Sequence, residues 1–232
     1  MFILIPAMNR YRSSQTRIVA GICATLAATY LGCVTTNADV SAVGSAKAQS
    51  PNRPASLKGV ADFAPPLDEG RDVIGMKPTR WLIRDWMNSE PLRLADLRGK
   101  VVLVRWWTAP GCPFCEASAP ALNDFWNRYR DRGLMVVGIY HHKSSGPLRV
   151  QNVEKQAAKF GFDFPIGIDP DWTTLQDWWL DKHGRGWTSV TFLLDREGII
   201  RHVHPGGAFF KGEPGYEMLE KKIKELLGET GE

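Results

Sequence analysis

Apolar and polar residues alternate in blocks through most of this chain, and the blocks predict buried strands followed by amphipathic helices. A near-continuous apolar run covers residues 101–107 and a second covers 133–140, a pattern typical of parallel strands buried on both faces. Between them, small and apolar residues recur at helical spacing from Ser118 to Tyr129. Strand, helix and strand in this order predict helices packed on a central sheet.

The rest of the pattern extends this arrangement into an α/β domain. Residues 196–198 (Arg-Glu-Gly) separate two strand-like segments, which predicts a hairpin. Pro214 and Gly228 bracket an amphipathic segment as the start and end of a last helix. The further predicted elements are strands at 80–87, 164–169, 189–195 and 199–204, a short strand and turn within 90–100, and helices at 150–160 and 172–180. A central mixed sheet flanked by helices is therefore the predicted fold.

The segment before the domain differs in composition. Residues 34–58 are rich in Ala, Ser, Thr, Asn and Pro and show little apolar periodicity, and loop-like sequence continues to about residue 77. We therefore predict a flexible tether over residues 34–77 and one folded domain over residues 78–228.

Residues 1–33 have the pattern of a targeting segment. Arg10, Arg12 and Arg17 form a positive region without acids, and the apolar run 18–31 that follows is too short for a comfortable membrane span of ~20 residues. These three arginines carry most of the formal charge of +4, because the other 26 basic residues face 25 acidic ones. The charge balance therefore does not favour nucleic acid as a partner.

The end of this segment resembles a bacterial lipoprotein signal. Gly32-Cys33 fits the end of such a signal, although Tyr30 stands where Leu is usual and Leu31 is bulky for its place. The resemblance implies that Cys33 is lipidated and tethers the domain to a membrane. A cleaved secretory signal and an uncleaved anchor are the alternatives. All three predict a domain outside the cytoplasm, in the bacterial periplasm.

Two of the four cysteines lie in the predicted domain. Cys23 belongs to the apolar run of the targeting segment and Cys33 to its end, which leaves Cys112 and Cys115 in the sequence Cys-Pro-Phe-Cys. A structural disulfide usually closes a longer loop, because little chain entropy is removed by joining residues three apart.

The position of this pair favours redox chemistry. It lies where a buried strand turns into a helix, and free N–H groups and the helix dipole stabilise a thiolate at a helix start. We therefore expect the pKa of Cys112 to lie below the free value of ~8.5, so that Cys112 is the nucleophile. Cys115, one turn deeper, would resolve the mixed disulfide. Pro113 suits the first helical turn.

Two other interpretations of the pair remain open. A zinc site would need two more ligands, and the chain has no second CxxC and no HxxxH. An inert pair in an exported binding protein would need nothing further.

The residues around the pair resemble the TlpA-like branch of the thioredoxin superfamily, in which membrane-tethered proteins exchange thiols and disulfides outside the cytoplasm. The resemblance covers about residues 78–228 and implies a thioredoxin-like fold, a redox disulfide between Cys112 and Cys115, protein partners, and no cofactor or metal. The matching residues are Leu94, Leu97, Gly99, Lys100, 101–104, Trp107, Ala109, Cys112, Cys115, Pro120, 191–195, Gly198 and Ile199.

The chain departs from this family in several places. Relatives usually carry a cis-proline that faces the cysteines, and that slot is Ser189 here, in Trp-Thr-Ser-Val-Thr-Phe. This departure puts ordinary substrate docking in doubt. Gly111 and Thr108 stand where tryptophans are usual. Ser118 stands where some relatives have an acidic residue, and Glu116 is expected to be solvated, so no carboxylate proton acceptor is predicted.

Two alternative functions follow from these departures. A peroxiredoxin-like peroxidase would also lack the cis-proline, but the Thr usual three residues before its reactive Cys is Ala109 here, with Thr108 one position away. A copper chaperone on a thioredoxin fold could combine the cysteines with nearby histidines, but such proteins space their cysteines by three residues. The candidate histidines are His141, His142, His202 and His204.

Two further expectations concern residues near the strand ends. His141 is a candidate proton acceptor for Cys115, since the carboxyl ends of parallel strands meet near the active site of such sheets. The later tryptophans are expected to serve mostly as core and edge packing, with a hydrophobic docking patch as the alternative. They are Trp172, Trp178, Trp179 and Trp187.

Overall fold

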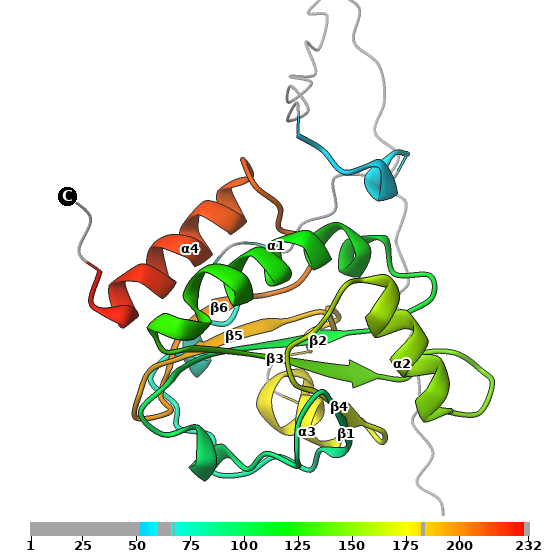
Figure 1. Ribbon diagram of the computed structural model, residues 1–232, viewed down its shortest axis with the longest axis horizontal. Coiled ribbons are helices and arrows are strands. Elements are labelled where there is room, and N and C mark those ends of the chain that lie inside the picture. The colour runs from blue at the N-terminus through cyan, green and yellow to red at the C-terminus, as the bar shows by residue number, and fades with distance from the viewer. Residues whose placement is uncertain (1–51, 60–65, 67, 182–183, 230–232) are drawn as a thin grey trace, which may run out of the picture. The chain divides into compact units, whose positions relative to one another are not determined.

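A six-stranded mixed sheet forms the centre of the molecule, and the computed structural model describes residues 52–59, 66, 68–181 and 184–229 (Figure 1). The strand order is β1-β4-β3-β2-β5-β6. Strands β2, β3 and β4 are parallel, and β1, β5 and β6 are antiparallel to the strands they join. The strands are β1 (Arg84–Met87), β2 (Val101–Trp107), β3 (Leu134–His141), β4 (Ile166–Asp169), β5 (Thr191–Leu194) and β6 (Ile200–His204). The predicted α/β architecture with a central mixed sheet is confirmed.

Helices cover both faces of this sheet (Figure 1). One face packs on α1 (Pro113–Tyr129), α2 (Val150–Lys159) and α4 (Pro214–Leu227). The other face packs on α3 (Thr173–Leu175) and on the π-helix Gln176–Leu180 that continues it. Every residue of β2 is buried, and its side chains enter the two cores alternately. The central strand thus carries the two cores on opposite faces, as the period of two in a strand requires.

The ends of α1 and α4 follow from short-range sequence signals. Pro113 and Pro214 occupy the first turns, where no helical N–H bond is lost. The Glu213 carboxylate caps α4 by accepting hydrogen bonds from the N–H groups of Gly215 and Tyr216, at 2.9 and 3.3 Å. Gly228 ends α4 with a φ of 85°, a left-handed conformation that glycine adopts without strain. The predicted bounds of this helix are confirmed.

The predicted short strand within 90–100 is wrong, because this segment forms the 3-10 helix Leu94–Leu97. Residues three apart align on one side of a 3-10 turn, so Leu94 and Leu97 both contact the core on the α3 face of the sheet. Asp96 stabilises the turn by accepting a hydrogen bond from the Arg93 N–H at 2.9 Å. Capping and burial of two leucines therefore outweigh the strand-like appearance of the segment.

The strand predicted over residues 80–87 is shorter in the structure. Only residues 84–87 of this segment form a strand, β1, which pairs with β4 through Arg84 opposite Ile168 and Met87 opposite Ile166, with a register shift between them. Asp85 has a positive φ of 52°, which an extended strand does not allow. The irregular backbone limits β1 to the edge of the sheet.

Parts of the predicted tether contact the folded domain. Leu57 is buried, and Val73 is buried in the core on the α3 face of the sheet. The division into a tether over residues 34–77 and a domain over 78–228 stays a prediction. The targeting segment 1–33, with the lipidation candidate Cys33, lies outside the described residues.

Among the residues that the structure describes, no helix is both long and apolar enough to cross a membrane.

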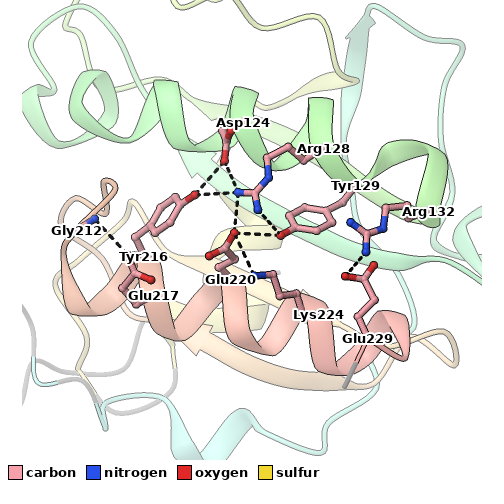
Figure 2. Close-up of polar contacts among 10 residues, drawn as sticks. All are labelled: Asp124, Arg128, Tyr129, Arg132, Gly212, Tyr216, Glu217, Glu220, Lys224 and Glu229. Atoms are coloured by element: carbon pink, nitrogen blue, oxygen red, sulfur yellow. Dashed lines mark hydrogen bonds and ion pairs between the residues drawn. The ribbon is translucent and has the colours of Figure 1, made fainter. Parts of the chain in front are cut away.

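A polar network joins the last turns of α1 to α4 (Figure 2). Arg128 contacts the carboxylates of Asp124 at 2.8 Å and Glu220 at 2.6 Å. Tyr129 donates to Glu220 at 3.0 Å, and Tyr216 donates to Asp124 at 2.9 Å. Burial raises the pKa of Tyr129 to about 12, and the hydrogen bond to Glu220 adds to the rise. The network fixes α4 against the C-terminal half of α1.

Candidate functional site

Cys112 and Cys115 form a disulfide at the point where β2 leads into α1. Cys112 is the N-cap of the helix, and its Sγ accepts a hydrogen bond from the Cys115 N–H at 3.1 Å. The two side chains differ in accessibility: Cys115 is 2% exposed, whereas Cys112 is partly exposed. A large disulfide substrate can therefore reach Cys112 and not Cys115. The helix start favours a thiolate at Cys112 for the same reason that it favours any anion.

Ser189 lies against both sulfur atoms. Its Oγ is 3.3 Å from the Cys115 Sγ and 3.8 Å from the Cys112 Sγ, and the residue is buried. Disulfide sulfurs carry no hydrogen, so the hydroxyl is the donor in these contacts. The slot that the sequence assigned to Ser189 therefore faces the cysteines, while its equivalence to the family's proline stays a prediction.

A buried arginine behind Ser189 is the functional candidate that sequence reasoning missed. Arg105, in the middle of β2, is completely buried, and its guanidinium donates to the backbone carbonyl of Ser189. It also donates to the Thr191 hydroxyl at 3.1 Å and the Gly207 carbonyl at 2.9 Å, and it lies 5.1 Å from the ring centre of Phe209. The available signal was one arginine inside the apolar run 101–107.

The surroundings of Arg105 provide only neutral hydrogen-bond acceptors. Its three hydrogen-bond partners are two carbonyls and a hydroxyl, and no ion pair joins it to a carboxylate within the described part of the chain. Burial lowers the pKa of Arg105 to about 9, which leaves the guanidinium charged at neutral pH. A single positive charge thus lies behind the redox pair without a compensating acid.

Ser118, the position at which some relatives have an acidic residue, forms structural hydrogen bonds here. Ser118 is completely buried, and its hydroxyl donates to the Phe114 carbonyl at 2.9 Å while accepting from the Phe209 N–H at 3.1 Å. Ser118 thereby holds the ring that lies on Arg105. Glu116 is exposed, which confirms the expectation that it is solvated.

The candidate histidines lie on two different faces of the sheet. His141 is buried, with Nε2 2.9 Å from the Thr188 hydroxyl and its ring against Trp172. His204 is in register with Thr191, which is itself opposite Arg105. Burial is the main cause that lowers the pKa of both histidines to about 3. Within the described residues no hydrogen bond joins His141 to a cysteine, so a proton-acceptor role for it is not supported.

No group of three or more His, Cys, Asp or Glu side chains suited to a metal ion occurs among the described residues.

The tryptophans divide between core and site. Trp178 and Trp179 are buried in the core on the α3 face, as the packing interpretation expects. Trp187 is partly exposed and contacts Phe114 of the Cys-Pro-Phe-Cys motif edge-on, with ring centres 5.7 Å apart. The possible docking patch is thus reduced to these two rings beside Cys112.

Comparison with known proteins supports the assignment of the fold. The AhpC/TSA family model matches residues 83–203, just over half of the 232 residues. The crystal structure of SPOA0173, a thioredoxin-like superfamily protein, superposes with a TM-score of 0.54 at 26% identity, over 68% of this chain and 99% of that structure. The predicted thioredoxin-like fold is therefore confirmed.

Two similar sequences cover most of the folded part of this chain, and one of them is named as a thiol-disulfide oxidoreductase. DipZ of Mycobacterium bovis is 30% identical over 179 residues, which are 76% of this chain and 24% of DipZ. Thiol-disulfide oxidoreductase YkuV of Bacillus subtilis is 28% identical over 145 residues, 62% of this chain and 89% of YkuV. The chain thus spans about a quarter of DipZ and most of YkuV. The predicted resemblance to thioredoxin-fold thiol–disulfide oxidoreductases is confirmed for this domain.

Proposed function

The chain belongs to the AhpC/TSA family, and from this premise we propose that it exchanges thiols and disulfides with protein partners outside the cytoplasm. Cys112 is the nucleophile and Cys115 the resolving thiol. The observation that carries the proposal is the asymmetry of the pair, since Cys112 is partly exposed at a helix start and Cys115 is buried one turn later.

The reaction proceeds in two exchanges. The Cys112 thiolate attacks one sulfur of a partner disulfide, which forms a mixed disulfide and releases the other partner sulfur as a thiolate. The Cys115 thiolate then attacks the Cys112 Sγ. This step forms the Cys112–Cys115 bond and releases the second partner sulfur as a thiolate. Two electrons pass from the dithiol to the partner, and the reverse sequence oxidises a partner dithiol.

The partner is proposed to be a protein with an accessible disulfide or dithiol. Trp187 and Phe114 form an apolar surface beside Cys112 on which extended chain can lie. A role outside the cytoplasm, with membrane attachment through a lipid on Cys33 or an uncleaved anchor, rests on the sequence of residues 1–33. Nucleic acid is not proposed as a partner.

The two cysteine variants provide the test. Cys112→Ser is expected to abolish reduction of insulin by the reduced protein, because no nucleophile remains in reach of a protein disulfide. Cys115→Ser is expected to accumulate mixed disulfides, which non-reducing electrophoresis resolves. Wild-type insulin reduction by Cys112→Ser would refute the proposal.

The same preparations separate the alternative functions. Consumption of peroxide by the reduced wild-type protein, faster than its reduction of insulin, would support the peroxidase. Stoichiometric copper or zinc retained by the reduced protein against a chelator would support the metal chaperone. Export is tested separately by fractionating cells that express the full chain and its Cys33→Ser variant.

A further inference from the structure

The charge of Arg105 has no acidic partner among the described residues. A buried charge is strongly unfavourable unless a counter-charge or several hydrogen bonds compensate for it. Arg105 has three bonds to neutral acceptors, and its Nε is buried without a partner. Replacement by an apolar residue in this all-buried strand would avoid this cost, so the residue points to a negative charge that forms during the reaction.

The geometry connects this cation to the sulfur atoms through one residue. Arg105 donates to the Ser189 carbonyl, and the Ser189 hydroxyl donates toward the Cys115 Sγ at 3.3 Å. The same guanidinium donates to Thr191 and Gly207, so it joins Ser189 and the start of β5 to the loop that follows β6. The residue whose hydroxyl contacts the buried sulfur is therefore held through its backbone by a positive charge.

Other charged groups around Arg105 do not cancel its field. His204 on β6 and His141 on β3 are neutral, because burial lowers the pKa of each to about 3. Glu213, before α4, directs its carboxylate to the N–H groups at the start of that helix. On α1, Glu116 is exposed. Asp169 on β4 is also buried, but its carboxylate accepts from Trp106, whose side chain lies in the core on the α3 face. Among the described residues no carboxylate forms a hydrogen bond or ion pair with Arg105.

We propose that Arg105 and the Ser189 hydroxyl stabilise Cys115 as a thiolate, so that the resolving step requires no carboxylate or histidine as proton acceptor. The inference rests on the proposed function and names the groups that make its second exchange possible. Ser189 contacts the reacting sulfur directly, and Arg105 acts as a positioning and electrostatic residue behind it.

The resolving step releases one proton and exchanges one S–S bond for another. The Cys115 thiol releases its proton to water, and the Ser189 hydroxyl donates a hydrogen bond to the resulting thiolate without giving up its own proton. The thiolate attacks the Cys112 Sγ of the mixed disulfide. One S–S bond forms, one breaks, and the partner sulfur leaves as a thiolate.

The test measures Cys115 alone, in the Cys112→Ser background, through the pH dependence of thiolate ultraviolet absorbance. Ser189→Ala should lower the ratio of Cys115 thiolate to thiol at a given pH about tenfold, because a hydrogen bond to a charged group is lost. Arg105→Met should lower it by about tenfold or more. Ser189→Thr and Arg105→Lys are the matched controls, since they keep the hydroxyl and the charge, and each should stay within about twofold of the parent.

Several results would overturn the inference. An unchanged ratio of Cys115 thiolate to thiol in Ser189→Ala would show that the hydroxyl does not stabilise the thiolate. Equal titration of Cys115 in Arg105→Met and Arg105→Lys would show that the charge does not stabilise it. Arg105→Met loses three buried hydrogen bonds, so its titration is compared with the parent only if the two circular dichroism spectra match. If the spectra differ, Ser189→Ala still tests the inference. Thiol titration requires no partner protein, so failure of this inference is separate from failure of insulin reduction by the wild type.

Discussion

At the first turn of α1, the redox pair lies beside Ser189 and a buried arginine whose partners are all neutral, whereas at the last turns a second arginine contacts two carboxylates (Figure 2). Arg105 is completely buried, and Arg128 is part-exposed between Asp124 and Glu220. Near the start of α1 the cation Arg105 has no acidic partner among the described residues, whereas near its end the cation Arg128 has two.

This difference shows how the two ends can serve different purposes. A cation paired with acids fixes two helices together and leaves little net field. A cation without an acid is costly in the resting protein, but it acts on whatever negative charge forms nearby. Carboxylates at the Cys112 end would cancel that field, and the structure instead gives Arg105 hydrogen bonds to a serine carbonyl, a threonine hydroxyl and a glycine carbonyl.

The largest effect is expected from acid at the redox end. His141 and His204 have a pKa of about 3 in the folded protein, below the unfolded value of about 6.5. Between these values the unfolded chain binds more protons, so stability falls as the pH drops below about 6.5 and is unaffected above it. The loss should be on the order of 2 kcal/mol for each histidine near pH 5. Urea denaturation at neutral and mildly acidic pH measures it.

The double variant His141→Gln, His204→Gln is the control for this prediction. It should lose most of the decrease between about pH 6.5 and 5, because two of the three histidines with a lowered pKa among the described residues are gone. The rest of the decrease should stay, because His202 remains and burial lowers its pKa to about 4. The α1–α4 end behaves differently. Burial pushes the pKa of Glu220 upward, but hydrogen bonds from Tyr129 and Arg128 outweigh this and hold it below its ordinary value. The contribution of Glu220 is therefore present above about pH 4.3 and is lost only below it. Equal unfolding free energies of the wild type at neutral and mildly acidic pH would contradict the prediction for the two histidines.

A smaller effect is expected when the compensated end is broken. Arg128→Met should lower the free energy of unfolding by about 1–2 kcal/mol, because the nearly buried Glu220 loses its strongest partner. The value is modest because the Arg128 side chain is 41% exposed and solvent screens the pair. Cys115 in the Cys112→Ser background should titrate as before. A shift of that titration would mean that the two ends of α1 are not independent.

The smallest effect is expected at the docking surface. Trp187→Ala removes the ring that contacts Phe114, and we expect insulin reduction to slow by about three- to tenfold while exchange with a small disulfide is unchanged. Leu82→Ala, at a side chain 53% exposed on the segment before the edge strand β1, is the matched control. Equal slowing with both substrates would show that Trp187 supports the fold of the site and not docking.

Much of this fold and part of the site could be predicted from short stretches of sequence. Helical and strand periodicity located β2, β3, α1 and α4, since these patterns act over a few residues. The segment around Leu94 misled this reasoning, because a single 3-10 turn is too short to show a helical repeat in the sequence. Arg105 could be noticed as an exception in an apolar run, but nothing local states which atoms surround it.

The sequence by itself determined that two cysteines lie at a strand–helix junction, because this depends on local pattern and spacing. That Ser189 takes the place of the family's proline stays a prediction from the sequence. Only the tertiary structure decided what those residues meet. It brought Arg105 to the Ser189 carbonyl across 84 positions of chain, and it kept carboxylates out of that contact. Charge compensation and burial depend on segments that are distant in sequence, and this is the physical reason why the redox pair could be located from the sequence while its electrostatic setting could not.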